Sequence, residues 1–293
     1  MNYIGLNGGV VDAGDAVVSV RDHGFLYGIG LFETFRTYGG RPFLLERHLE
    51  RMAEGCRQLG IPYKPDPVGL TDWIAELMKR NGLQEAYIRY TVTAGEDVLG
   101  LPAGDYTRPN QVLFTKALPQ RPVELDINGK ELQLLKLPRN TPEGPVRFKS
   151  LHYMNNILAK RELSLYPSAA RSAEGLMLTE RGEVAEGIVS NVFFVKEGRL
   201  FTPDESAGIL PGITREMVME LAGTEGLEVE TGLYPWEMLS TADEVFLTNS
   251  IQEIVPVTIL WKENERMVVG SGSAGPVTSV LLKKYRQRAG VEQ

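Results

Sequence analysis

Lys149 is the residue of this sequence best suited to covalent chemistry. It lies in the segment Phe148-Lys149-Ser150-Leu151-His152-Tyr153, at a predicted junction between a strand and a helix. A lysine ε-amine forms a Schiff base with an aldehyde once it has lost its proton, which burial and cationic neighbours such as Arg147 favour. A helix that starts at Lys149 would bring the phenol of Tyr153 to the same side. Taken alone, Lys149 is interpreted as a solvated surface charge and Tyr153 as a core tyrosine.

Glu186 is a second candidate, because it stands just before the mostly apolar segment Ile188–Phe194. A carboxylate at the end of a buried strand needs a partner, since an unpaired buried charge is costly. The partner can be a catalytic ligand. It can equally be a structural salt bridge or a hydrogen bond within a turn.

A third candidate is the turn Gly208-Ile209-Leu210-Pro211-Gly212, which leads into a predicted helix with Thr214 as its N-cap. The start of a helix offers free N–H groups and a favourable dipole to a phosphate. Arg51 can supply the positive charge, although its simpler interpretation is a surface arginine. Many helices start with such a turn and bind nothing, so this signal is weak alone.

The elements that position these residues are of mixed type. In the N-terminal part of the chain we expect strands at Tyr3–Leu6, Ala16–Val18, Leu31–Tyr38, Ala86–Thr93 and Gln111–Ala117. We also expect two helices, one with the apolar face Leu49, Met52, Ala53, Cys56, Leu59 and one over Asp72–Arg80 with Thr71 as N-cap. Alternation along Ala86–Thr93 puts Arg89 on a polar face with hydroxyl-bearing neighbours.

A proline-rich connection then marks a domain boundary. We expect a small N-terminal α/β domain over residues 1–118, a linker over 119–128 and a larger strand-rich domain over 129–293, which contains Lys149. The expected strands of the second domain are Leu132–Leu137, Gly175–Thr179, Val189–Val195, Glu244–Leu247 and Ile254–Leu260, with helices near Leu151–Leu165, Arg215–Ala222 and Val277–Gln287. The fold class predicted is therefore α/β (α+β) with two domains.

Composition argues against several classes of protein, among them nucleic-acid-binding, membrane and metal-binding proteins. The 293 residues can bury a substantial core, and Cys56, the one cysteine, is interpreted as a core residue, which fits a reducing cytoplasm. A net charge of -7 opposes a nucleic-acid-binding surface. The absence of a basic N-terminal segment and of a long apolar run predicts a cytoplasmic protein without a membrane span. His23, His48 and His152 show no metal-site spacing, so we expect no metal.

Taken together and in order, several segments resemble the fold-type IV pyridoxal-phosphate enzymes, the class IV aminotransferase family. The matching segments are Tyr27–Thr34, His48–Arg51, Lys149, Glu186-Gly187 with Ser190-Asn191, Leu210–Thr214 and Thr248-Asn249-Ser250. The resemblance spans nearly the whole chain. It implies a small N-terminal α/β domain, a larger barrel-like second domain, pyridoxal 5'-phosphate between them, a homodimer and a small-molecule substrate.

The resemblance also implies roles for individual residues. Lys149 would be the Schiff-base lysine, and Glu186 would face the pyridine nitrogen, whose protonation strengthens the ring as an electron sink. Tyr153 would contact the phenolic oxygen of the cofactor. The implied phosphate ligands are Arg51, Ile213, Thr214 and Ser250, and the implied substrate contacts are Tyr27, Arg89 and Asn249.

Within the family, the segments Asp22–Arg36, Arg139–Gly144 and Thr248–Ser250 look most like bacterial 4-amino-4-deoxychorismate lyases. This implies a lyase of folate biosynthesis that forms 4-aminobenzoate and pyruvate. An aminotransferase acting on D-amino acids or branched-chain amino acids stays open, because Arg89 matches an arginine of the branched-chain enzymes. A non-catalytic metabolite-binding protein is the more distant alternative.

Overall fold

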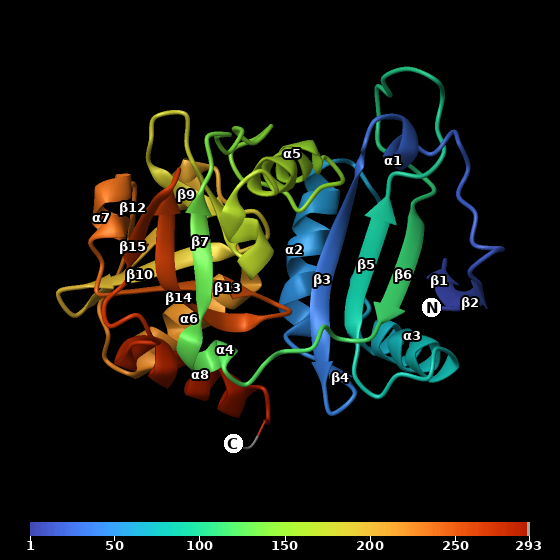
Figure 1. The fold of residues 1–293 in the computed structure, drawn as a ribbon. Helices are drawn as coiled ribbons and strands as arrows, with labels where there is room; N and C mark the ends of the chain where they lie inside the picture. The colour runs from blue at the N-terminus through green and yellow to red at the C-terminus, as the bar shows by residue number, and fades with distance from the viewer. Residues whose placement is uncertain (292–293) are drawn as a thin grey trace. The chain divides into compact units, whose positions relative to one another are not determined.

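The computed structural model describes residues 1–291 and divides the chain into two compact units. Unit 1 comprises Met1–Pro119 together with Phe148–His152, and unit 2 comprises Gln120–Arg147 and the chain from Tyr153 onward. The short segment 148–152 thus packs with the N-terminal unit, whereas the sequence-based division placed it in the second domain. Figure 1 shows the elements of both units.

Unit 1 is built on a six-stranded antiparallel sheet with the order β2-β1-β6-β5-β3-β4. Its strands are β1 Tyr3–Leu6, β2 Gly9–Asp12, β3 Gly30–Tyr38, β4 Arg41–Pro42, β5 Tyr87–Thr93 and β6 Asn110–Lys116. The predicted strand at Ala16–Val18 is wrong, because residues 15–18 form an irregular segment that is mostly exposed.

Two helices, α2 (Leu45–Gln58) and α3 (Pro67–Arg80), supply the apolar side chains that cover one face of this sheet. Cys56 is fully buried in that core, as its spacing predicts. The N-cap of α3 is Asp66, whose side chain accepts from the backbone of Gly69, and Pro67 occupies the first turn. The prediction of Thr71 as the N-cap is therefore wrong. A short helix, α1 (His23–Leu26), precedes β3.

The segment 148–152 pairs with the beginning of β3 through an isolated antiparallel bridge between Leu31 and Ser150. The backbone N–H of Phe32 donates to the carbonyl of Lys149 at 2.9 Å, and the N–H of Leu151 donates to the carbonyl of Gly30 at 3.0 Å. Cross-strand partners project to the same face of a sheet, so this pairing puts the side chains of Lys149 and Phe32 together.

The pairing also corrects the helix predicted over Leu151–Leu165. The helix α5 spans Met154–Leu163, and Tyr153 is its N-cap residue. The backbone around Lys149 is hydrogen-bonded to β3 and is not helical. Lys149 and Tyr153 therefore do not share a helical turn, and the predicted geometry for them is wrong.

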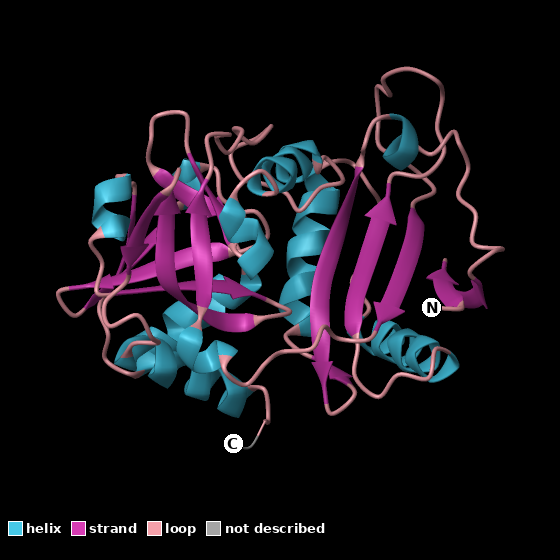
Figure 2. Ribbon diagram, in the orientation of Figure 1, coloured by secondary structure: helices cyan, strands magenta, loops and turns pink. Residues whose placement is uncertain are grey.

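Unit 2 is built on a nine-stranded mixed sheet with the order β12-β11-β10-β13-β14-β7-β8-β9, and β15 pairs with β14. Figure 2 shows its strands in magenta. The strands are β7 Lys130–Leu134, β8 Glu174–Leu178, β9 Val184–Gly187, β10 Asn191–Lys196, β11 Arg199–Pro203, β12 Val229–Gly232, β13 Glu244–Asn249, β14 Glu253–Lys262 and β15 Glu265–Val268. The sheet curls so that β9 also contacts β10, which makes it a half-barrel.

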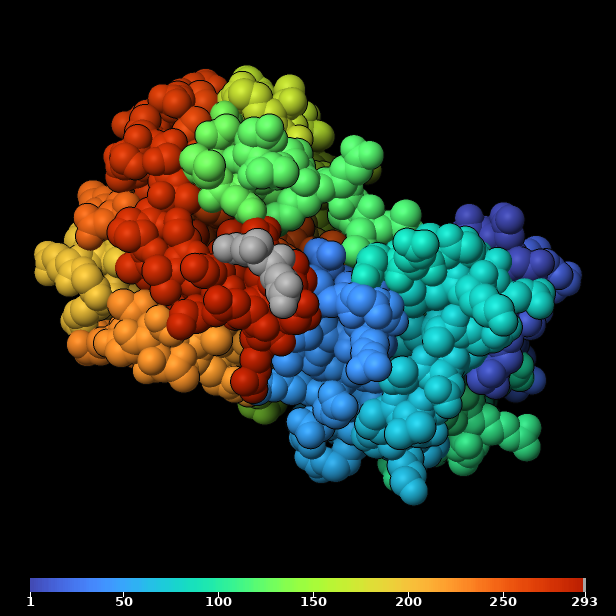
Figure 3. Space-filling model, turned by 90° about the horizontal axis from the view of Figure 1, so that it is seen from below, coloured from blue at the N-terminus to red at the C-terminus, as the bar shows by residue number. Residues whose placement is uncertain are grey.

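Helices pack around this half-barrel. They are α4 (Leu125–Asn128), α5, α6 (Ile213–Thr224), α7 (Trp236–Ser240) and α8 (Pro276–Arg288), with 3-10 turns at Pro167–Arg171 and Glu205–Ala207. Figure 3 shows α8, in red, at the surface of unit 2. The α/β fold class with a small antiparallel sheet and a larger half-barrel is confirmed. No helix within residues 1–291 is long and apolar enough to cross a membrane.

Candidate active site

In unit 1, the ring of Phe32 has two cationic side chains close to it. Lys149 Nζ is 5.0 Å from the ring centroid, and Arg89 Cζ is 3.5 Å from it. Arg89 is on β5, opposite Thr34 of β3, on the face that carries Phe32. The predicted polar face of β5 is therefore observed, and the structure brings the candidates Lys149 and Arg89 to the same aromatic ring. Cations are attracted to such a ring face.

Tyr27, another candidate, is held beside the lysine segment. The Nε2 atom of His152 lies 2.9 Å from the Tyr27 carbonyl, and the Tyr27 hydroxyl accepts the N–H of Gly100 at 3.0 Å. The ring of His152 packs on Gly28, which has a φ of +72°, and a Cβ at Gly28 would be 2.4 Å from that ring. Glycine is thus required where the loop approaches the lysine segment.

Arg51 is part of a buried ionic cluster and not a surface arginine. Its Nε and Nη2 atoms donate to the two carboxylate oxygens of Glu33, at 2.8 and 2.6 Å. The Nδ1 atom of His48 is 2.6 Å from the same carboxylate. Glu33 and His48 are each 1% exposed, and the Arg51 side chain is 17% exposed.

This cluster has a defined charge state. Burial raises the pKa of Glu33, but the charges of Arg51 and His48 outweigh it and lower that pKa to about 2. Burial lowers the pKa of His48 despite the opposing charge of Glu33. The low pKa of Glu33 means that it is a carboxylate near neutral pH, paired with the guanidinium of Arg51.

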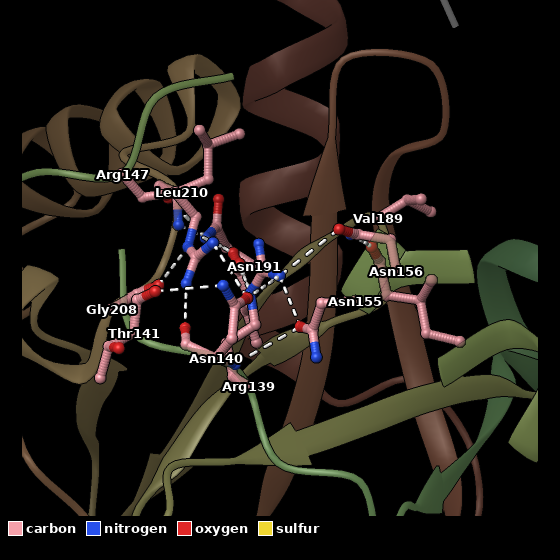
Figure 4. A network of polar contacts seen from close by, with 12 residues as sticks. Arg139, Asn140, Thr141, Arg147, Asn155, Asn156, Val189, Asn191, Gly208 and Leu210 are labelled. Atoms are coloured by element: carbon pink, nitrogen blue, oxygen red, sulfur yellow. Dashed lines mark hydrogen bonds and ion pairs between the residues drawn. The ribbon is translucent and has the colours of Figure 1, made fainter. Parts of the chain in front are cut away.

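In unit 2, Glu186 is a buried carboxylate with a partner at each oxygen. Its Oε1 accepts from Arg139 Nε at 2.8 Å, and its Oε2 accepts from the N–H of Leu210 at 3.0 Å and from Asn191 Nδ2 at 3.3 Å. Arg139 is in turn held by Asn155, whose Oδ1 accepts from Nη1 at 2.7 Å (Figure 4). Both ends of the Arg139–Glu186 pair are 6% exposed.

Arg147 supports the loop that carries Arg139. Its guanidinium donates to the Gly208 carbonyl and to the backbone and side-chain oxygens of Asn140 (Figure 4). Burial, and then the charge of Arg139, lower the pKa of Arg147 to about 10. Through these hydrogen bonds Arg147 joins Gly208 to Asn140, the residue next to Arg139.

The helix α6 begins at Ile213, and its N-cap residue is Gly212, not the predicted Thr214. No side chain within residues 1–291 caps it. Ile213 and Thr214 lie in its first turn, where backbone N–H groups point out of the helix. The Oγ1 atom of Thr214 lies 3.3 Å from Oγ of Ser250. The structure thus brings together three of the residues that the resemblance assigns to the phosphate.

A buried hydroxyl lies on the sheet face beside this helix start. Thr248 pairs directly with Asn191 across β13 and β10, so both side chains project to one face. Asn191 reaches the turn before α6, because its Nδ2 donates to the Leu210 carbonyl at 2.9 Å. The Oγ1 atom of Thr248 is buried and has no hydrogen-bond partner within residues 1–291.

Asn249 shapes the turn that presents Ser250. Its Oδ1 accepts the N–H groups of Ile251 and Gln252, at 3.0 and 2.7 Å. Its Nδ2 lies 3.4 Å from Gln252 Oε1. The substrate contact expected of Asn249 remains a prediction, and the observed hydrogen bonds give it a role in the turn.

Each unit fits part of a pyridoxal phosphate molecule. Unit 2 offers the start of α6 with the hydroxyls of Thr214 and Ser250, which suit a phosphate, and the carboxyl group of Glu186, which suits a protonated ring nitrogen. Unit 1 offers Lys149 for the aldehyde and the guanidinium of Arg51 for further negative charge. Within residues 1–291 there is no group of three or more side chains suited to a metal ion.

Glu33, His48 and Arg139 lie in segments that resemble the family, but no individual role was predicted for them from the sequence. Glu33 lies in an alternating strand at a position that faces the core, and a charged residue at such a position signals a buried partner. His48 and Arg51 are three residues apart on α2, which places them on one side of that helix. Arg139 carried no comparable local signal.

The model of the family described as amino-transferase class IV matches residues 30–260. The chain therefore belongs to the class IV aminotransferase family, and it is a pyridoxal-phosphate-dependent enzyme, either a lyase or an aminotransferase.

Individual relatives include both activities. The chain is 43% identical to aminodeoxychorismate lyase of Bacillus subtilis, over 96% of this chain and 93% of that protein. It is 38% identical to a putative branched-chain-amino-acid aminotransferase of Methanocaldococcus jannaschii, over 96% of this chain and 94% of that one. A solved branched-chain aminotransferase from Thermoproteus uzoniensis, with norvaline, superposes with a TM-score of 0.84 at 27% identity, covering 99% of this chain and 96% of that chain.

Proposed function

We propose that this chain is a pyridoxal-phosphate-dependent 4-amino-4-deoxychorismate lyase that forms 4-aminobenzoate and pyruvate. The observation that carries the proposal is its identity to the Bacillus subtilis lyase, which extends over almost the whole chain and exceeds that to the putative aminotransferase. The fold supports neither activity over the other, because it is also similar to a branched-chain aminotransferase.

Lys149 is the proposed catalytic base. When bound, pyridoxal phosphate supplies an aldehyde that takes up the ring amine of the substrate and a pyridine ring that withdraws electrons from the carbon bearing that amine. Lys149, which holds the cofactor before the substrate arrives, removes the proton from this carbon. The electron pair of the broken C–H bond expels the enolpyruvyl oxygen and makes the ring aromatic. The expelled enolpyruvate takes up one proton and leaves as pyruvate.

In unit 1, we propose that Phe32 confines Lys149 and that Arg89 binds the substrate. The ring of Phe32 limits the volume open to Lys149 Nζ, since it lies 5.0 Å away on the same sheet face. Arg89 is the proposed ligand of a substrate carboxylate, because a guanidinium matches the two oxygens of a carboxylate. Tyr27 is a further proposed substrate contact.

In unit 2, Glu186 is proposed to face the pyridine nitrogen. Arg139 is the cationic partner of this buried carboxyl group, and the N–H of Leu210 orients it. The backbone of Ile213 and Thr214 and the hydroxyl of Ser250 are proposed to bind the phosphate. The guanidinium of Arg51, from unit 1, is proposed to bind it as well. Tyr153, at the N-terminus of α5, is proposed to bind the phenolic oxygen of the cofactor.

We also propose that the enzyme is a homodimer. One face of α5 exposes Met154, Ile157 and Leu158, which are 74%, 56% and 47% accessible. These side chains follow the spacing of a single helix face. A contiguous exposed apolar face is typical of an interaction surface, and a second copy of this chain is the proposed partner.

An aminotransferase is the second candidate function. The similarity to the Methanocaldococcus jannaschii protein favours it, as does the position of Arg89 beside the lysine. An aminotransferase would convert bound cofactor to its amine form when it is given a donor amino acid alone. A lyase would need no second substrate.

The test is to supply cofactor-loaded protein with freshly generated 4-amino-4-deoxychorismate and to measure 4-aminobenzoate and pyruvate together. We expect equal amounts of both products and none from Lys149→Ala. Lys160→Ala, which changes an exposed lysine on α5, is the matched control and should keep full activity. A yellow wild-type protein that forms neither product but transfers an amino group from D-alanine or L-leucine would move the function to an aminotransferase.

A further inference from the structure

The buried cluster around Glu33 includes an arginine with a proposed part in binding. Glu33 is on the core-facing side of β3, between Leu31 and Phe35, which both belong to the apolar core. A charge at such a position is costly unless it is fully paired. Here it is fully paired, because Arg51 occupies one side of the carboxylate with two bonds and His48 occupies Oε2 as well.

The geometry of the pair fixes the orientation of Arg51. A guanidinium bound through Nε and Nη2 lies in the plane of its carboxylate and cannot rotate without breaking both bonds. The Nη1 edge is then directed away from Glu33. The Arg51 side chain is 17% exposed, whereas those of Glu33 and His48 are 1% exposed, so the cluster anchors an arginine that reaches the border of the core.

We propose that Glu33 is a positioning residue, which holds Arg51 in the orientation needed to bind the phosphate of pyridoxal phosphate. His48 secures the carboxylate from α2, the helix that also carries Arg51. The inference rests on the proposed role of Arg51 in phosphate binding. It does not depend on whether the enzyme is a lyase or an aminotransferase.

A purely structural ion pair makes a different prediction. A structural pair stabilises the fold and affects all ligands alike. A positioning pair affects only the ligand group that Arg51 contacts. The ratio of the dissociation constants of pyridoxal and pyridoxal phosphate measures how much the phosphate contributes to cofactor affinity. This ratio distinguishes a positioning pair from a purely structural pair.

The experiment measures both dissociation constants on the full-length apoprotein, by absorbance and by fluorescence quenching, for wild type, Glu33→Gln and Arg51→Lys. We expect Glu33→Gln to raise the dissociation constant of pyridoxal phosphate by about tenfold, the size typical of one lost hydrogen bond to a charged group. Binding of pyridoxal should not change. Arg51→Lys should give a similar loss, and the double variant should lose no more than Arg51→Lys alone, because both changes act through one group.

Glu54→Gln is the matched control. It removes the charge of an exposed glutamate on α2 that pairs with Arg57, and it should leave both constants unchanged. If Glu33→Gln does not fold, Glu33→Asp keeps the charge but shortens the side chain, and the same loss for pyridoxal phosphate alone is expected. An unchanged ratio in the variants at Glu33, or in Arg51→Lys, would overturn the inference. A failed lyase assay with intact ratios would overturn only the proposed function.

Discussion

Replacing Arg139 by methionine should destabilise unit 2 strongly, because it leaves Glu186 as an unpaired buried charge. Arg139 and Glu186 are 2.8 Å apart, and each side chain is 6% exposed. Methionine keeps much of the volume of the arginine stem and removes the charge. After the change, Glu186 would keep only the hydrogen bonds from Leu210 and Asn191.

The chain offers a matched comparison at the same distance. Arg171 and Glu131 are also 2.8 Å apart, but their side chains are 45% and 13% exposed. Breaking a buried pair by removing one partner costs about 3–5 kcal/mol, whereas an exposed pair contributes about 0–1 kcal/mol. We therefore expect Arg139→Met to lower the free energy of unfolding by roughly 3–5 kcal/mol and Arg171→Met by far less.

The assay is urea unfolding of the apoprotein at pH 7.5, followed by circular dichroism. A double variant, Arg139→Met with Glu186→Gln, removes the stranded charge and should recover most of the lost stability. Equal losses for Arg139→Met and Arg171→Met would refute the argument from burial. A double variant as unstable as Arg139→Met would show that the lost contacts to Asn155, and not the charge of Glu186, cause the effect.

Four further predictions concern single residues. Glu186→Gln should slow turnover at least tenfold while the protein stays folded, because a neutral amide no longer holds a proton on the pyridine nitrogen; a rate equal to that of the wild type under saturating substrate would contradict this. The pKa of Glu33 is lowered from 4.5 to about 2, so its contribution to stability is present above about pH 4.5 and is lost as the pH falls toward 2. Glu33→Gln should therefore weaken the dependence of the unfolding free energy on pH in this acid range. An unchanged dependence would contradict a stabilising ion pair at Glu33. Ile157→Glu on the exposed face of α5 should give a monomer in light scattering, and a dimer of unchanged affinity would exclude that face. Burial raises the pKa of Cys56 to about 12, so a thiol reagent at pH 8 should label it only in urea, and rapid labelling of the native protein would be inconsistent with its packing.

Local periodicity predicted most of the elements around the site. The apolar spacing of Leu49, Met52 and Cys56 predicted α2, and alternation predicted β3 and β5 together with the face that carries Arg89. These signals depend on which side of an element is buried, and a single segment of sequence contains that information.

Other features depend on contacts between distant segments. The start of α5 was predicted too early, because main-chain pairing with β3 holds Lys149 extended, and nothing near Lys149 in the sequence indicates that pairing. The partners of Glu33 and Glu186 were missed for the same reason. The N-cap of α3 is a different case, since Asp66 followed by Pro67 is a local signal that favours a helix start at that position.

The pairing of segment 148–152 with β3 forms late during synthesis of the chain. Unit 1 lacks this segment until the ribosome has released residues 148–152, which follow Gln120–Arg147. Until then the backbone edge of β3 at Gly30–Phe32 is unpaired in the growing chain. An open strand edge is a site of mispairing. A fragment ending at Pro119 should therefore aggregate more readily than the whole chain. The residue proposed for catalysis lies in the segment that closes this edge, so the N-terminal sheet and the reactive lysine are completed together.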